Sequence, residues 1–142
     1  MNPVTLSEHI AIRLVHSDAA GVLFYPRLFE IEQDLFERWL ECGGFSLREM
    51  LDGRLVPTPV VHCEADYRLP IRPGDRILAT LAGVGVGRSG YALAWNFTKG
   101  EELAASVRVK RVAIDPRAQA STDLPEALRH WLLATQAKTA TL

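Results

Sequence analysis

The chain has 142 residues, of which 48% are hydrophobic and 23% are charged, and this composition is typical of a globular domain rather than a disordered segment. Lysine and arginine number 16 against 17 aspartates and glutamates, so the net charge of −1 provides no basic excess for binding nucleic acid. We therefore expect one domain over residues 1–142, with a core that needs no covalent or metal support.

The N-terminus and the cysteines bear on where the protein works. Residues 1–8 lack the basic start and apolar stretch of a signal peptide, and no apolar run approaches the roughly 20 residues of a membrane span. Cys42 and Cys63 form neither a C-x-x-C pair nor a Cys/His cluster, which favours two reduced thiols and leaves one disulfide open. These features predict a cytoplasmic protein with no membrane partner.

The first half of the chain predicts a strand followed by a long helix. Residues 8–15 alternate between apolar and polar side chains, as a half-buried strand does. Residues 26–41 follow the helical period with a broad apolar face, carry proline in the first turn and end at a Gly-Gly pair. A short helical turn over 45–51 and a loop over 53–59 follow. The inward side chains of the first strand would be Ile10, Ile12 and Leu14.

The second half predicts four more strands, over 60–69, 76–84, 91–97 and 103–114. Because short turns join them in succession, they predict an antiparallel sheet. The order of strand, long helix, four strands and helix indicates an α+β fold in which one sheet wraps the long helix.

The end of the chain predicts a second, shorter helix. Asp123 and Glu126 have the spacing of a capping box at the start of an amphipathic C-terminal helix. Residues 138–142 follow that helix and are expected to fray.

The stretch from His16 to Pro26 contains the candidate chemistry. Asp18 stands in a glycine-containing turn between the first strand and the start of the long helix. A helix N-terminus presents unpaired N–H groups and partial positive charge, which suit a developing oxyanion. A carboxylate beside such a site is an arrangement for acyl transfer. Aspartate before a helix is also a common turn or cap residue, so the local pattern leaves both interpretations open.

Three motifs resemble the 4-hydroxybenzoyl-CoA thioesterase family, whose fold is the hotdog. They are Asp18-Ala19-Ala20-Gly21-Val22-Leu23-Phe24-Tyr25-Pro26, Pro57-Thr58-Pro59-Val60-Val61 and Arg72-Pro73-Gly74-Asp75. The resemblance extends over residues 8–114 and includes the order of the elements. It implies a thioesterase acting on an aromatic or compact acyl-CoA, as a homodimer or homotetramer with sites between subunits. It implies no cofactor, since coenzyme A is part of the substrate.

The resemblance also implies roles for single residues. Asp18 would be the catalytic carboxylate, as nucleophile or general base, and the backbone N–H of Tyr25 would polarise the thioester carbonyl. Gly21 would give the loop its backbone angles. The acyl group would meet Phe29, Gln33, Phe36 and Thr58. The phosphates of coenzyme A would meet Arg88 and Ser89, with further charge from Arg108, Lys110 and Arg111.

Gln33 departs from the pattern of the aromatic-acyl relatives. Those relatives can carry a carboxylate at this position to meet a ring hydroxyl, whereas this chain has a neutral amide. The departure argues against 4-hydroxybenzoyl-CoA itself. Other aryl, hydroxyaryl and short acyl groups stay open.

Several other features have a less specific interpretation. His16 is expected to be structural, and the shared face of His62, Glu64 and Asp66 is expected to be a solvated or subunit-facing surface rather than a metal site. A hydratase or dehydratase of the same fold is disfavoured because no histidine follows Asp18 within the helix. A protein that binds acyl-CoA without turnover is a further alternative, distinguished by ligand binding without thiol release.

Overall fold

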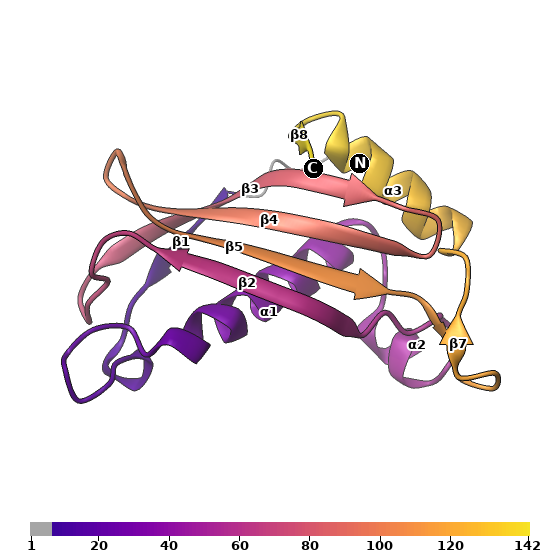
Figure 1. The fold of residues 1–142 in the computed structure, drawn as a ribbon, viewed down its shortest axis with the longest axis horizontal. Coiled ribbons are helices and arrows are strands. Elements are labelled where there is room, and N and C mark those ends of the chain that lie inside the picture. The colour runs from indigo at the N-terminus through magenta and orange to yellow at the C-terminus, as the bar shows by residue number, and fades with distance from the viewer. Residues whose placement is uncertain (1–6) are drawn as a thin grey trace.

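The long helix α1 spans Tyr25–Cys42 and packs across one face of an antiparallel sheet, in a computed structural model that describes residues 7–142 (Figure 1). The sheet order is β1-β3-β4-β5-β2, so the first two strands of the chain form its two edges. This arrangement is the predicted α+β fold. The strand bounds are β1 Ser7–Ala11, β2 Val60–Tyr67, β3 Arg76–Val86, β4 Gly90–Lys99 and β5 Glu102–Val112.

Alternate side chains of the central strands and one stripe of α1 form the core. Leu28, Leu35 and Trp39 of the helix are almost completely buried, as are Trp95 and Phe97 of β4. Burial of each such side chain contributes roughly 1.5–3 kcal/mol relative to exposure, so this interface dominates the stability of the fold. The helix is thereby held at a fixed position on the sheet, and its N-terminal end lies below the edge strand β2 in the view of Figure 1.

Strand β2 is an edge strand, and this position explains its exposure. Val61, Cys63 and Ala65 share one face of the strand, yet only Ala65 is half-buried and the other seven residues of β2 are exposed. One side of β2 pairs with β5, with Val60 opposite Arg111 and Tyr67 opposite Ala105. Within residues 7–142 the opposite side pairs with no strand.

The N-terminal strand is shorter than predicted. β1 ends at Ala11, and Leu14–His16 forms a 3₁₀ turn, so the expected strand over 8–15 is wrong in its second half. Ile12 is buried as predicted, whereas Leu14 is 79% exposed. The chain leaves the sheet here because the backbone of Ile12 bonds to Gly74 and Asp75 in the β2–β3 turn instead of continuing the ladder.

The C-terminal region also differs from the prediction made from the sequence. Helix α3, Glu126–Gln136, has no side-chain cap, because its N-cap residue is Pro125 and not the predicted Asp123, whose carboxylate accepts a hydrogen bond from Arg88 at 2.7 Å. Residues 138–142 do not all fray. Strand β8, Ala140–Thr141, pairs in parallel with β3 next to Gly83, where a Cβ would meet the side chain of Leu142.

The smaller elements complete the fold. Helix α2, Leu47–Leu51, begins after Ser46, whose side chain accepts the N–H of Glu49, and agrees with the predicted helical turn. The last predicted strand is divided, since β5 ends at Val112 and β6, Ile114–Asp115, pairs with β7, Ala120–Ser121, in a separate hairpin. No helix within residues 7–142 is long and apolar enough to cross a membrane.

Candidate functional site

The loop that contains Asp18 is closed by local hydrogen bonds. The Asp18 N–H donates to the Val22 carbonyl at 2.9 Å, and the Gly21 N–H donates back to the Asp18 carbonyl at 3.1 Å. Gly21 has a φ of +76°, a left-handed conformation that glycine adopts without steric cost, as the sequence predicted. The loop is therefore a compact turn, and its backbone geometry depends on Gly21.

The Asp18 side chain is exposed and has one local partner. Its Oδ1 atom accepts the Ala20 N–H at 2.8 Å, which is the turn role that the sequence left open. Within residues 7–142 its second carboxylate oxygen has no hydrogen-bond partner. The side chain is thus oriented by the turn and still presents one oxygen to the exterior.

The start of α1 lies directly after this loop. The Phe24 N–H donates to the His16 carbonyl at 2.8 Å, so the loop returns to its own beginning before the helix starts at Tyr25. Among the described residues the Tyr25 N–H has no acceptor. The Tyr67 hydroxyl donates to the Tyr25 carbonyl at 2.6 Å, and partial burial, with a smaller contribution from the Tyr25 phenol, raises the pKa of Tyr67. This bond connects the helix start to the free edge strand.

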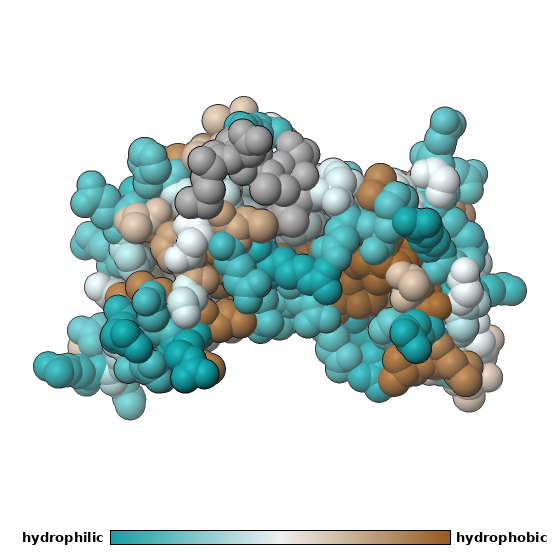
Figure 2. All heavy atoms as spheres, turned by 180° about the vertical axis from the view of Figure 1, so that it is seen from behind, coloured by the Kyte–Doolittle hydropathy of each residue, from teal (hydrophilic) through white to brown (hydrophobic). Residues whose placement is uncertain are grey.

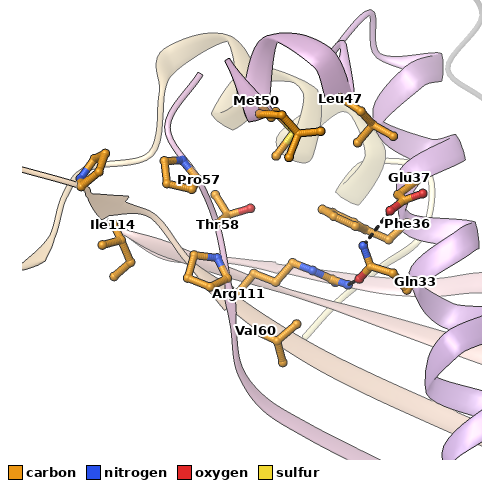
Figure 3. Close-up of a pocket in the computed structure, with 13 residues that line it drawn as sticks. Gln33, Phe36, Glu37, Leu47, Met50, Pro57, Thr58, Val60, Arg111 and Ile114 are labelled. Carbon is orange, nitrogen blue, oxygen red and sulfur yellow. Dashed lines mark hydrogen bonds between the residues drawn. The ribbon is translucent and has the colours of Figure 1, made fainter. Parts of the chain in front are cut away.

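A pocket of about 490 Å³ opens beside the other end of β2 (Figure 3). α1 forms one wall, α2 a second, and the chain around Thr58 together with the end of β5 the remainder. Most of the lining is apolar. The lining residues are Gln33, Phe36, Glu37, Leu47, Met50, Leu51, Pro57, Thr58, Pro59, Val60, Arg111, Ile114 and Pro116.

A buried ion pair supports one wall of this pocket. Arg111 and Glu32 are 1% and 2% exposed, and both guanidinium NH groups donate to the Glu32 carboxylate, at 3.1 and 2.9 Å. Arg111 also donates to Gln33 Oε1 at 3.1 Å, and its Cζ lies 3.6 Å from the centre of the Phe36 ring. Gln33 in turn donates from Nε2 to Glu37 Oε1 at 3.1 Å.

A hydroxyl pair lies at the base of the pocket. Thr58 Oγ1 and the Tyr91 hydroxyl are 2.8 Å apart, and both residues are buried. Burial raises the pKa of Tyr91 to about 12, so this phenol stays neutral at physiological pH. The Thr58 hydroxyl therefore has a neutral phenol as its partner.

The predicted phosphate-binding residues line a different groove. Arg88, Ser89, Arg108 and Lys110 border a depression of about 360 Å³ between β3, β4 and β5. Arg108 and Lys110 are exposed there, and Arg88 is exposed although it is paired with Asp123. Arg111 is not part of this groove. The prediction that it adds charge for the phosphates is wrong, because its position in β5 turns it into the core toward Glu32.

Apart from Arg88 and Ser89, the predicted site residues fall into two groups within one chain. Gln33, Phe36 and Thr58 line the pocket, whereas Asp18, Gly21, Tyr25 and Phe29 do not. Phe29 is half-buried against the core. The carboxylate loop therefore lies at the start of α1 and at one end of β2, whereas the pocket lies beside the middle of α1 and at the other end of β2.

The histidines and cysteines considered in the sequence analysis form no further candidate site among the described residues. His16 Nδ1 accepts the Arg13 N–H at 2.9 Å, which is a turn contact. His62 and Glu64 approach within 3.8 Å on the exposed face of β2, but residues 7–142 contain no group of three potential metal ligands. Cys42 and Cys63 are both free thiols.

The sequence analysis did not identify Glu32 and Glu37. Glu32 lies four residues after Leu28 and four before Phe36, so the helical period had placed an acid on the apolar stripe. Arg111 follows Val107 and Val109 at the strand period and had the inward register. The sequence thus contained a signal for the Glu32–Arg111 ion pair, because residues of opposite charge occupy inward positions on the helix and on the strand.

Comparison with known proteins places the chain in a family. The model of the thioesterase-like superfamily matches residues 8–132. The chain belongs to that superfamily. The match confirms the resemblance to the hotdog thioesterases and the prediction that this protein is a thioester hydrolase.

Individual relatives of this thioesterase agree with the family assignment. A 1,4-dihydroxy-2-naphthoyl-CoA hydrolase of Rippkaea orientalis is 32% identical over 128 residues, which are 88% of this chain and 93% of the relative. A 1,4-dihydroxy-2-naphthoyl-CoA thioesterase structure from Synechocystis superposes with a TM-score of 0.82 at 21% identity, over 89% of this chain and 94% of that one. The structure of a gentisyl-coenzyme A thioesterase superposes with a TM-score of 0.77 at 22% identity, over 87% of this chain and 99% of that one. The two structures confirm the predicted fold.

Proposed function

We propose that this thioesterase hydrolyses an aromatic acyl-CoA at a site composed of two subunits. The observation that carries the proposal is the loop over residues 17–24, which holds an exposed carboxylate and leads directly into the unpaired N–H at the start of α1. The Rippkaea relative and the two solved relatives are named for aromatic acyl-CoA substrates, which supports the aromatic class. A largely apolar pocket of about 490 Å³ has the size for one or two fused rings.

In the proposed reaction the thioester carbonyl oxygen accepts the Tyr25 N–H, and the helix dipole stabilises the negative charge that develops there. Asp18 then acts in one of two ways. It attacks the carbonyl carbon, breaks the C–S bond and forms an anhydride that water hydrolyses, or it removes a proton from water that attacks directly. Either route converts acyl-CoA and water to the free acid and the CoA thiol.

The proposed dimer explains why the two groups of site residues are separate in one chain. If β2 pairs with its own copy about a two-fold axis, the strands run antiparallel and Val60 of one chain lies near Tyr67 of the other. Tyr67 is bonded to Tyr25, so the carboxylate loop of one subunit would approach the pocket of its partner. Exposed β edges commonly pair in this way.

The surface near both ends of β2 suits such an interface. Val15, Phe24 and Tyr25 are exposed near the carboxylate loop, and Leu51 and Val60 are exposed near the pocket. Figure 2 shows hydrophobic surface toward both ends of the lower edge, with a hollow between them. A two-fold axis would bring each apolar end against the opposite end of the partner. In the same proposal the coenzyme A phosphates bind Arg88, Ser89, Arg108 and Lys110.

The test is thiol release from benzoyl-, hydroxybenzoyl-, 1,4-dihydroxy-2-naphthoyl-, phenylacetyl- and short-chain acyl-CoAs by the wild type and Asp18→Asn. Asparagine keeps the oxygen that accepts the Ala20 N–H, so the turn is preserved while the charge is lost. We expect turnover of an aryl-CoA, and a loss of about 100- to 10,000-fold in the variant. Absence of turnover with tight acyl-CoA binding would favour a non-catalytic binding protein. An active Asp18→Asn would remove Asp18 from the mechanism.

A further inference from the structure

The pocket has a polar strip on the α1 side and apolar side chains on most of its other walls. Arg111, Gln33 and Glu37 follow one another along this strip, joined by hydrogen bonds (Figure 3). We propose that Glu37 determines substrate specificity by accepting a hydrogen bond from a hydroxyl group of the acyl moiety, and that Gln33 positions it. This inference rests on the proposed function and adds a residue that selects hydroxylated over unsubstituted aryl groups.

The first step of the argument is the fixed position of Arg111. Its bidentate bond to Glu32 is completely buried, and the Phe36 ring lies against its guanidinium. A bidentate guanidinium–carboxylate pair has a fixed planar geometry, and breaking it would leave a charge in the core. Arg111 therefore directs one N–H at the pocket wall, toward Gln33, in a defined direction.

The second step is the orientation of the Gln33 amide. Because Arg111 can only donate, the Gln33 atom that faces it must be the oxygen, and the NH₂ group must point the other way. That NH₂ group donates to Glu37 Oε1. The Glu37 carboxylate can only accept, so Arg111 and Glu37 both select this orientation of the exposed Gln33 side chain.

The third step concerns the open oxygen of Glu37. Gln33 occupies Oε1, and within residues 7–142 Oε2 has no hydrogen-bond partner, although Glu37 is half-buried in the pocket lining. A carboxylate can accept further hydrogen bonds and cannot donate one. The group that suits Oε2 is therefore a donor, and a phenolic hydroxyl on a ring within the pocket supplies it.

The other walls offer few competing acceptors. Leu47, Met50 and Ile114 are apolar, and the Thr58 hydroxyl is already bonded to Tyr91. A hydroxyl directed toward these walls would lose its water without compensation, whereas one directed toward Glu37 keeps a charge-assisted bond. An unsubstituted ring would instead leave the Glu37 carboxylate partly desolvated. Sites of this kind discriminate strongly against the analogue that lacks the hydroxyl.

The experiment compares benzoyl-CoA with its three monohydroxy isomers, and 2-naphthoyl-CoA with 1,4-dihydroxy-2-naphthoyl-CoA. For the wild type we expect kcat/KM to favour at least one hydroxylated member. Glu37→Leu should lower that kcat/KM by about 10- to 100-fold and raise kcat/KM for the unsubstituted partner, because the carboxylate that its ring desolvates is gone. Glu41→Leu is the matched control, since Glu41 lies on the exposed surface of α1 outside the pocket lining.

A positioning role for Gln33 has its own readout. Gln33→Leu should reduce the ratio of kcat/KM for the hydroxylated substrate to kcat/KM for the unsubstituted one, by a smaller factor than Glu37→Leu does. Equal loss on both substrates would indicate a structural effect and overturn the role of Gln33.

The remaining outcomes separate this inference from the function on which it rests. If the wild type hydrolyses aryl-CoAs but Glu37→Leu lowers kcat/KM for both substrates by the same factor, or for neither, the Glu37 proposal is wrong. The proposed function then stands. If the wild type hydrolyses none of the thioesters, the proposed function is wrong and the Glu37 proposal fails with it.

Discussion

The start of helix α1 and its middle are constructed in different ways. At the start, the Asp18 loop is exposed and most of its hydrogen bonds are local, although the Leu23 N–H donates to the distant Ile71 carbonyl at 2.7 Å. In the middle, beside the pocket, Glu32 is buried with Arg111, which lies 79 positions away in the chain. The first region is organised mainly by local backbone geometry, and the second by the packing of the whole sheet against the helix.

Because of this difference, substitutions in the two regions should affect different properties of the protein. Charges in the exposed loop are hydrated, so changing one there alters reactivity at little cost to folding. A charge in the pocket wall is enclosed, so changing it alters the free energy of unfolding first. Asp18, the candidate reactive group, thus lies where substitution costs little stability. The Arg111–Glu32 pair, which supports the pocket wall, lies where substitution costs much more.

The largest expected effect comes from recombining the two regions across the proposed dimer. Asp18→Asn lacks the carboxylate, and Met50→Trp/Ile114→Trp narrows the pocket from two walls. In a refolded equimolar mixture, half of the dimers are mixed and one of their two sites is intact. Two nearly inactive proteins should therefore regain about a quarter of wild-type thiol release.

The control is each variant refolded alone, which should stay inactive. A mixture that shows no recovery, although chromatography detects mixed dimers, would place the carboxylate and the pocket of one site in the same chain. That result would contradict the pairing of β2 edges and leave the two regions of α1 functionally unconnected.

The buried pair should give the next largest effect, this time on stability. Arg111→Met leaves Glu32 as an unpaired buried charge and should lower the free energy of unfolding by about 3–5 kcal/mol. Glu32→Leu/Arg111→Met removes both charges and should recover most of that loss. Urea denaturation measures both variants. If the double variant were as unstable as the single one, packing against Phe36 rather than charge would account for the loss.

The same contrast explains what could be predicted from the sequence. The Asp18 loop, the long helix and the alternating central strands are local patterns, so the fold and the helix start at Tyr25 could be read from neighbouring residues. The 3₁₀ turn after β1 could not, because contacts with Gly74 and Asp75 end the strand.

The pocket wall depended on long-range pairing. Gln33, Phe36 and Thr58 were predicted to meet the acyl group, and all three line the pocket, but their role there is still a prediction. Arg111 was assigned to the phosphates although it shares the strand period of Val107 and Val109, because the sequence alone does not pair it with an acid. Only the packed structure shows that Glu32 lies opposite Arg111.

A neutral contact at the pocket base should have a smaller effect than the ion pair. Tyr91→Phe removes the hydroxyl that bonds Thr58 at 2.8 Å, and it leaves one buried hydroxyl with a lost partner. We expect the free energy of unfolding to fall by about 1–2 kcal/mol. Thr58→Val/Tyr91→Phe removes both hydroxyls and should be closer to wild type. An unchanged Tyr91→Phe would mean that water replaces the missing group.

The smallest expected effect concerns a second aspartate turn, which differs from the Asp18 loop by the presence of a cation. Asp75 accepts the Arg72 N–H at 2.9 Å and bonds Lys99 at 2.8 Å, and the Lys99 hydrogen bond lowers the pKa of this carboxyl below its ordinary value of 3.8. A lowered folded pKa contributes stability above the unfolded value, and this is lost as pH falls through the folded value. Asp75→Asn should therefore be less stable than wild type near neutral pH, and the difference should shrink below about pH 4. Urea unfolding across this range measures it, and a difference independent of pH would show that the turn depends on the shape of Asp75 and not on its charge.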